Sequence, residues 1–335
     1  MERVSHTIMH KCSRDVNNVL LNFPLAQFPM PVAQLPITNA QSCMSSQESE
    51  INESLAKELC SPLQGKRLFF DYGMTAVAFA LAILALIPLL SVVWEIITRG
   101  LSGLKPEMFF KEVIDNGFAN AIVGTLVMVA IASLISIPCG VMTGIFLSEF
   151  GQGSKIASSI RFITTILTGV PSIVVGVFAY GVIVLVQKQF SALAGGFALA
   201  VIMLPIVVLT TEEALKLIPV PQRLASAALG GNRLQTTFRV VVAAALPGIT
   251  TGVLLGVSRA AGETAPLIFT ALFSQYWSEN LSSPTASLSV LIFNLYNDPS
   301  PEKTALVWTA SIILLGIVLF ISLLSRIFIR RKKTR

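Results

Sequence analysis

Long apolar runs separated by short polar segments make up most of this chain. A helix of about 20 apolar residues can cross the hydrocarbon core of a bilayer, and roughly six runs reach about that length. These runs are Phe69–Ile97, Ala119–Leu147, Ile160–Val186, Ser191–Leu209, Val240–Ala261 and Leu306–Ile329. The pattern predicts an all-α membrane protein with about six transmembrane helices.

The polar segments complete the expected domain organisation. We expect a polar cytoplasmic N-terminal tail at 1–65, the first transmembrane helix with an external loop at 66–118, a transmembrane core at 119–330 and a basic cytoplasmic tail at 331–335. The stretch after Met44 has the composition of a short cytoplasmic leader, whereas residues 1–43 have no coherent pattern. Met44 is therefore the expected true start of the protein.

Composition agrees with a membrane protein and excludes a soluble globule. The chain is 53% hydrophobic and only 13% charged, with a mean hydropathy of +0.74. The net charge of +6 does not indicate nucleic-acid binding, because the Lys and Arg residues lie in loops and the tail rather than in one basic domain. Membrane lipid is the expected surrounding.

The distribution of basic residues predicts the orientation of the chain. One side of the membrane has Lys57, Lys66, Arg67, Lys155, Arg161, Lys216, Arg223, Arg233, Arg239 and the basic residues from Arg326 onward. The other side has Arg99, Lys105, Lys111, Lys188 and Lys303. Because cytoplasmic loops carry an excess of Lys and Arg, both termini and the loop Thr211–Arg239 are expected in the cytoplasm.

The loop Thr211–Arg239 has the pattern of a short helix followed by a turn and a second helix. Pro219 and Pro221 end the incoming helix, since proline lacks an N–H and clashes with the preceding turn. One apolar face then follows, made of Leu224, Ala225, Ala227, Ala228 and Leu229. Gly230 tolerates a positive φ, and Asn232 is a suitable N-cap for the next helix. The loop is a knob presented to a partner, or an amphipathic segment that lies on the lipid surface.

Two groups of glycines interrupt the apolar runs. Gly248, Gly252 and Gly256 recur every four residues, which favours close helix packing. The segment Gly169–Gly176 contains Pro171, which removes a backbone hydrogen bond within the third span. Close packing explains this segment as well as a local unwinding does, in which N–H groups would point at an anion.

Arg259 and Glu263 are four residues apart, so they share one helix face near the outer end of the fifth span. An ionisable group at the centre of a bilayer costs about 2.5–3.5 kcal/mol on insertion scales, and such groups are usually paired or functional. The pair is either a structural ion pair or an oxyanion site. In the second case Arg259 binds phosphate with bidentate geometry. Glu263 then orients it or accepts a hydrogen bond from a protonated phosphate oxygen, which sulfate cannot donate.

These segments together resemble a known family. ABC importer permeases carry the loop pattern EAA, three residues, Gly, nine residues, I-x-L-P, and Arg223–Gly230 falls in register with it, although Leu224 replaces the Glu. The stretch Arg259-Ala-Ala-Gly-Glu-Thr-Ala-Pro-Leu267 resembles the signature of PstA-type permeases of the phosphate ABC importer. Gly169-Val-Pro-Ser172 and Thr211-Glu-Glu-Ala214 also resemble that family, and the match covers about residues 66–330.

The resemblance implies a type I ABC importer permease fold with a cytoplasmic coupling helix that docks on an ATPase subunit. The implied residues of the ATPase coupling loop are Arg223, Leu224, Ala225, Ser226, Ala227, Ala228 and Gly230. The implied residues of the substrate pathway are Arg259, Glu263, Thr264 and Ser172.

The resemblance also implies a cargo, a location and partners. The cargo is inorganic phosphate, which a multi-pass protein of the cell inner membrane translocates by alternating access. The partners are a second permease of PstC type, a dimer of a PstB-type ATP-binding subunit and a periplasmic phosphate-binding protein of PstS type.

The chain itself lacks the residues of an enzyme. It has no G-x-x-x-x-G-K-[ST] motif, so ATP is expected on a partner and no cofactor on this chain. Neither a nucleophile–base cluster nor a His-rich metal site is present in the sequence, so no catalytic residue and no metal are expected.

Other functions remain open from the sequence. The same machine could carry another oxyanion, such as sulfate or molybdate. An ion-coupled secondary transporter usually has several ionisable residues at the bilayer midplane, and the second, third and fourth predicted spans hold none at that depth. A membrane scaffold without transport activity would not need Arg259 and Glu263 within a span.

Overall fold

The computed structural model describes the backbone of residues 65–332 and the side chains of residues 69–323. The predicted tail before residue 65, the expected start at Met44 and the last three residues of the basic tail lie outside the described residues. The chain divides into two compact units, Met1–Pro88 and Leu89–Arg335.

The described part of the first unit is helical. Helix α3 (Gly65–Gly103) begins there, and its residues Phe69, Phe79 and Leu84 are exposed apolar side chains. A helix whose apolar residues are exposed on all sides suits lipid, because its backbone polar groups are satisfied within the helix. The predicted first span is therefore a continuous helix.

The second unit contains the remaining helices. After a 3-10 turn at Pro106–Phe109, the long helices are α4 (Ala119–Ile145), α5 (Lys155–Gly169), α8 (Ala192–Lys216), α11 (Val242–Gly262) and α14 (Pro301–Lys332). The short helices are α6 (Ser172–Ala179), α7 (Leu185–Gln187), α9 (Val220–Ala228), α10 (Arg233–Gln235), α12 (Ala265–Thr270) and α13 (Leu288–Leu295). π-helical turns at Phe146–Phe150, Tyr180–Val184 and Thr236–Val241 extend α4, α6 and α11. No strand occurs between residues 65 and 332.

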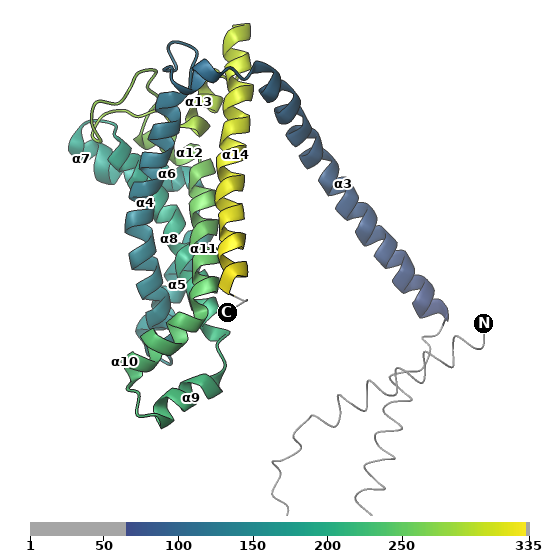
Figure 1. Ribbon diagram of the computed structural model, residues 1–335, viewed down its shortest axis with the longest axis vertical. Helices are drawn as coiled ribbons and strands as arrows, with labels where there is room; N and C mark the ends of the chain where they lie inside the picture. The colour runs from purple at the N-terminus through teal and green to yellow at the C-terminus, as the bar shows by residue number, and fades with distance from the viewer. Residues whose placement is uncertain (1–64, 333–335) are drawn as a thin grey trace, which may run out of the picture. The chain divides into compact units, whose positions relative to one another are not determined.

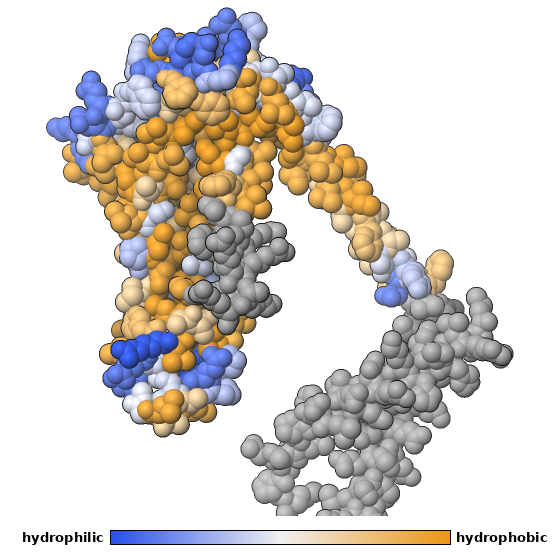
Figure 2. Space-filling model, in the orientation of Figure 1, coloured by the Kyte–Doolittle hydropathy of each residue, from blue (hydrophilic) through white to orange (hydrophobic). Residues whose placement is uncertain are grey.

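Five helical segments are long and apolar enough to cross a membrane, and a sixth span is counted if a bent pair forms one. This agrees with the predicted number of about six. The five segments are Phe69–Gly103, Ala119–Phe150, Ala192–Lys216, Arg233–Gly262 and Pro301–Leu323. Figure 2 shows the apolar side chains of the second unit between polar residues at its two ends.

The third predicted span, Ile160–Val186, is not one continuous helix. Helix α5 ends at Gly169, and the helical segment that restarts at Ser172 is bent from it by 106°. Val170 and Pro171 are extended, with ψ values of 128° and 135°. Proline disfavours the α conformation of the residue before it, which accounts for the break at this point. Both explanations left open for Gly169–Gly176 apply, since the helix breaks at Val170 and Pro171 and Gly176 packs closely against Pro266.

The fourth span also differs from the prediction, because α8 continues past Leu209 to Lys216. Polarity suggested a loop from Thr211 onward, but the chain stays helical until Pro219 prevents a further turn. Glu212 consequently lies inside a helix and is 2% exposed. The sequence did not reveal this buried carboxylate.

Helix α8 packs closely against α4 and α11 (Figure 1). A Cβ atom on Gly248 would lie 2.9 Å from Ala214 Cβ, and one on Gly256 would lie 3.1 Å from Met203 Cγ. A Cβ on Gly252 would overlap the Thr210 side chain. The glycine stripe of α11 therefore lets two backbones approach, which confirms the packing interpretation.

We expect Gly252→Ala to destabilise the protein by about 1–3 kcal/mol, because the added methyl group overpacks the contact with Thr210. Gly316→Ala is the matched control, since a Cβ at Gly316 of α14 meets no atom within 4 Å. Thermal unfolding of the detergent-solubilised protein measures both. Equal midpoints for the two variants would contradict tight packing at Gly252.

Candidate functional site

The predicted coupling loop forms a helix, a glycine turn and a second helix at one end of the second unit (Figure 1). Helix α9 begins after Pro219, and Gly230 has a φ of 81°. Asn232 and Gln235 form a reciprocal capping box that starts α10. The predicted local structure is confirmed. A Cβ on Gly230 would meet nothing within 4 Å, so the turn requires glycine for its backbone conformation rather than for space.

The apolar face of α9 is open in this chain. Leu224 is 64% exposed and Leu229 is 90% exposed. A shallow groove of about 470 Å³ runs between the two helices of the loop, lined by Gln222, Ala225, Ser226, Leu229, Gly231, Gln235, Arg239 and Val240. Exposed leucines beside a groove form a surface that a partner protein can cover.

Arg223 turns away from this exposed face and binds the end of α4. Its Nη2 lies 2.8 Å from Glu149 Oε1, and its Nε lies 3.4 Å from Glu149 Oε2. The same guanidinium donates to the carbonyl oxygens of Ile218 at 2.5 Å and Leu215 at 3.0 Å. Arg223 therefore holds α9 to two other parts of the chain.

A second buried carboxylate lies nearby, on α8. Glu212 Oε1 accepts from Arg161 Nε at 2.7 Å and lies 3.1 Å from Lys216 Nζ. Arg161 also donates to the carbonyl oxygen of Leu147 at 2.8 Å. This network joins α4, α5 and α8 at the same end of the unit.

The predicted substrate pair lies at the junction of α11 and α12. Arg259 Nε is 3.3 Å from Glu263 Oε1, with the arginine side chain 56% exposed and the glutamate side chain 16% exposed. Helix α11 ends at Gly262, and Glu263 is extended with a ψ of 133°. The pair is thus a real contact at a helix break rather than within a continuous helix.

The packing of α11 places this pair beside α8. A Cβ on Gly256 of α11 would lie 3.1 Å from Met203 Cγ, and Met203 lies within α8. Arg259 follows Gly256 by three residues, so it lies alongside α8 within one helical turn of this contact.

The other two predicted pathway residues lie at the starts of neighbouring short helices. Thr264 immediately precedes α12, and Ser172 is the first residue of α6. The two helices pack together, since a Cβ on Gly176 would lie 2.7 Å from Pro266 Cα. Within residues 69–323 no hydrogen bond joins Ser172 to Arg259 or Glu263, so the structure does not bring all four residues into one contact set.

A cavity of about 540 Å³ opens beside Thr264. Polar residues of and after α13 line it with Thr264, namely Ser289, Asn294, Tyr296 and Asn297. Ser289 Oγ donates to the backbone carbonyl of Glu263 at 2.9 Å, which fixes the break to α13. Ile292 and Phe293 complete the lining, so the break between α11 and α12 faces a cavity with both polar and apolar walls.

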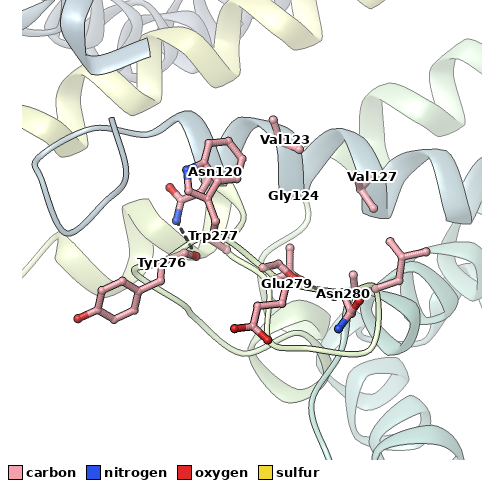
Figure 3. A pocket seen from close by; sticks show the side chains of 13 residues that line it. Asn120, Val123, Gly124, Val127, Tyr276, Trp277, Glu279 and Asn280 are labelled. Carbon is pink, nitrogen blue, oxygen red and sulfur yellow. Dashed lines mark hydrogen bonds between the residues drawn. The ribbon is translucent and has the colours of Figure 1, made fainter. Parts of the chain in front are cut away.

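A separate cavity of about 340 Å³ lies between the first turns of α4 and the loop that follows α12 (Figure 3). Asn120 of α4 donates to the carbonyl oxygen of Tyr276 at 3.1 Å, and Trp277 and Glu279 also line the cavity. None of the predicted pathway or coupling residues lines it. The loop that follows α12 forms one wall of this cavity.

Between residues 69 and 323 no group of His, Cys, Asp or Glu side chains could hold a metal ion.

Comparison with known proteins assigns the family. Residues 136–334 match the family model described as "Binding-protein-dependent transport system inner membrane component". The chain belongs to this family of inner-membrane transport components. It is also 38% identical over 291 residues to the phosphate transport system permease protein PstA of Yersinia pestis, covering 85% of this chain and 97% of that protein. The resemblance to PstA-type permeases is confirmed.

A more distant relative and a solved structure agree with this assignment. The probable PstA permease of Methanocaldococcus jannaschii is 35% identical over 268 residues, covering 78% of this chain and 95% of that protein. An inward-facing structure of the MetNI methionine ABC transporter covers 68% of this chain and 99% of its own chain, with a TM-score of 0.54 and 19% identity. The predicted type I ABC importer permease fold is confirmed. This permease is a multi-pass protein of the inner membrane and a subunit of a transport system.

Two sheltered carboxylates of this permease, each paired with an arginine, were not predicted from the sequence. Glu149 and Glu212 are 9% and 2% exposed at the side chain, and each pairs with an arginine far away in sequence. The family-like stretch Thr211-Glu-Glu-Ala214 was a signal for Glu212, but spacing alone cannot pair residues 51 or 74 positions apart.

We expect Arg161→Ala to destabilise the permease by about 3 kcal/mol, because it leaves the buried Glu212 carboxylate with only Lys216 as a partner. The double variant R161M/E212M should retain most of the stability, since apolar residues can replace a buried ion pair at little cost. Thermal unfolding of the purified protein tests both. A double variant that is less stable than the single one would refute this account.

Proposed function

We propose that this permease is the membrane subunit of an ATP-driven importer that translocates inorganic phosphate. Its relatives of 35–39% identity are described as phosphate transport system permeases, and the chain covers 85–97% of their lengths in the alignments. The other components in this proposal are a PstC-type permease, a dimer of a PstB-type ATPase and a PstS-type phosphate-binding protein.

The state of Arg259 carries this proposal. Its guanidinium uses only Nε, toward Glu263, and within residues 69–323 the two terminal nitrogens have no hydrogen-bond partner. A half-exposed guanidinium at membrane depth cannot face lipid without a large cost, so it must face a partner subunit or a water-filled path. Free terminal nitrogens offer the parallel N–H groups that bind two oxygens of a phosphate.

Glu263 can supply selectivity in the same site. Only Oε1 of its carboxylate contacts Arg259, and Oε2 has no hydrogen-bond partner among the described side chains. Monohydrogen and dihydrogen phosphate carry a proton that can be donated to this oxygen, whereas sulfate at neutral pH carries none. A carboxylate acceptor therefore favours phosphate and repels sulfate.

The coupling residues Arg223 to Gly230 provide the other half of the mechanism. In this proposal both termini and α9 lie in the cytoplasm, where ATP binding closes the ATPase dimer. Closure moves α9 and opens the pathway toward the binding protein. Phosphate then passes the breaks at Ser172 and Thr264 beside Arg259. Hydrolysis returns the pathway to the inward-facing state, and this chain itself contributes no ATP site, no cofactor and no metal.

The same structure could serve another oxyanion, such as sulfate or molybdate. The selectivity that Glu263 confers decides between these cargoes and phosphate. An ion-coupled secondary transporter receives less support. The buried carboxylates Glu149 and Glu212 lie at the α9 end and are paired with arginines, so neither is placed as a proton or sodium relay at midplane.

We expect Arg259→Ala to lower phosphate uptake about 100-fold, because it removes charge-assisted hydrogen bonds of about 3 kcal/mol from the bound anion. Arg259→Lys should be intermediate, since lysine keeps the charge but not the bidentate geometry. Uptake of labelled phosphate in cells that lack the native chain measures this, normalised to the amount of permease in the membrane. Wild-type uptake that persists with Arg259→Ala at equal membrane levels would refute the site.

Glu263→Gln should lose discrimination rather than all transport. Glutamine removes the negative charge that repels sulfate and supplies an N–H donor. Excess sulfate should then compete with labelled phosphate in the variant and not in the wild type. If sulfate competes with neither, Glu263 is only a structural partner of Arg259; if it competes with the wild type, the cargo is broader than phosphate.

The turn at Gly230 provides a test of ATPase docking on the α9 loop. Gly230→Val forces a β-branched residue to a φ of 81°, a strain of about 1–2 kcal/mol. Gly230→Asn adds a similar side chain into the same open space, but asparagine adopts this conformation readily. We expect the ATPase subunit to co-purify with the asparagine variant and to be lost from the valine variant. Equal retention by both would contradict a docking role for the turn.

A further inference from the structure

The ion pair between Arg223 and Glu149 connects the coupling helix to an element with which it has no direct chain connection. Helix α9 follows α8 and precedes α10, whereas Glu149 lies 74 positions earlier, in the π-helical turn that ends α4. The contact uses both carboxylate oxygens and two guanidinium nitrogens. Such a paired arrangement fixes direction as well as distance.

The second helix of the loop binds the same place. Arg233 of α10 donates to the backbone carbonyl of Glu149, and its guanidinium lies 5.1 Å from the ring centroid of Phe150. Arginines on both sides of the Gly230 turn therefore converge on residues 149 and 150. We call Glu149, Arg223 and Arg233 the Glu149 clamp.

The clamp is sheltered from solvent, unlike an ordinary surface ion pair. The Glu149 side chain is 9% exposed and that of Arg223 is 24% exposed. Arg223 is additionally held by the carbonyl oxygens of Leu215 and Ile218 at the end of α8. A sheltered and multiply bonded pair is rigid, so α9, the end of α8 and the end of α4 must move together or break several bonds at once.

Leu224 gives the clamp its significance. The family pattern has a glutamate at this position of the coupling loop, and this chain has an exposed leucine there. The carboxylate beside Arg223 comes from the end of α4 and not from the loop itself, so the contact joins two helices.

We propose that Glu149 is a positioning residue for coupling: its carboxylate fixes α9 to the cytoplasmic end of α4, so that a displacement of α9 displaces α4. Helix α4 in turn packs against α11, which ends at the break beside Glu263 and Thr264. A displacement of α4 therefore reaches the Arg259–Glu263 pair. The inference rests on the proposed function, because it takes α9 as the site where the ATPase acts.

The test uses the complete transporter with its partner permease, ATPase and phosphate-binding protein in lipid vesicles. Two quantities are measured: ATP hydrolysis stimulated by the phosphate-loaded binding protein, and phosphate transported per ATP hydrolysed. We expect Glu149→Gln to assemble normally and to lower phosphate per ATP about tenfold, a size typical of coupling between sites. Arg223→Lys should retain part of the coupling, and Arg223→Gln should lose as much as Glu149→Gln.

Glu212→Gln is the matched control. Glu212 is also a sheltered carboxylate paired with an arginine at the same end, but its partners lie on α5 and α8 and not on α9. We expect this variant to lower thermal stability while phosphate per ATP stays at the wild-type value. A tenfold loss of coupling in both variants would show that any sheltered ion pair at this end suffices, and would overturn the proposal.

An unchanged ratio in Glu149→Gln at wild-type assembly would overturn it as well. The proposed function fails in a different way, since the wild-type complex itself would then show no phosphate transport and no stimulation by the binding protein. Should Glu149→Gln not assemble, the double variant E149Q/R223M, which leaves no unpaired charge, gives the same decision. An assembled double variant with wild-type coupling would refute the positioning role.

Discussion

Close backbone packing around α8 is the constraint on which the second unit depends. Glycines of α4 face it on one side, where a Cβ on Gly140 would lie 2.8 Å from Val207 Cγ1. Glycines of α11 face it on the other, and α8 adds Gly195 and Gly196 against Met128 and Ile131 of α4. Lipid offers no hydrophobic drive for helices to associate, so this fit of small residues supplies the contact that holds them. It also sets the depth of every residue on α11, including Arg259.

The charged side chains of the second unit fall into two groups. The sheltered carboxylates Glu149 and Glu212 are both at the α9 end, and each is matched by arginine. Arg259 is the contrast, since only its Nε has a partner among residues 69–323 and its side chain remains half exposed. Paired charges at one end hold helices together, whereas in the proposed mechanism the terminal nitrogens of Arg259 bind the anion.

The helix breaks connect these two kinds of charge. Helix α5 ends at Gly169 and α11 ends before Glu263, and the short helices that restart, α6 and α12, pack against each other. A broken helix near a charged residue presents backbone groups that a continuous helix would consume. The Glu149 clamp joins the α9 loop to α4, and α4 packs against α8 and α11.

The sequence by itself determined the class, the number of spans and the shape of the coupling loop. Apolar run length, Pro219, Gly230 and Asn232 act locally, through backbone chemistry that is readable from a few neighbouring residues. The same holds for the contact of Arg259 with Glu263, because four residues make one helical turn.

Features that depend on contacts between residues distant in sequence were decided by the tertiary structure alone. The third span bends by 106° at Pro171. A proline in the sequence indicates that a helix breaks, but it does not predict the angle of the break. The continuation of α8 to Lys216 buried Glu212, against the polar pattern that suggested a loop. The partner of Arg223 came from α4, because pairing across 74 positions is set by how helices pack and not by the spacing of residues along one of them.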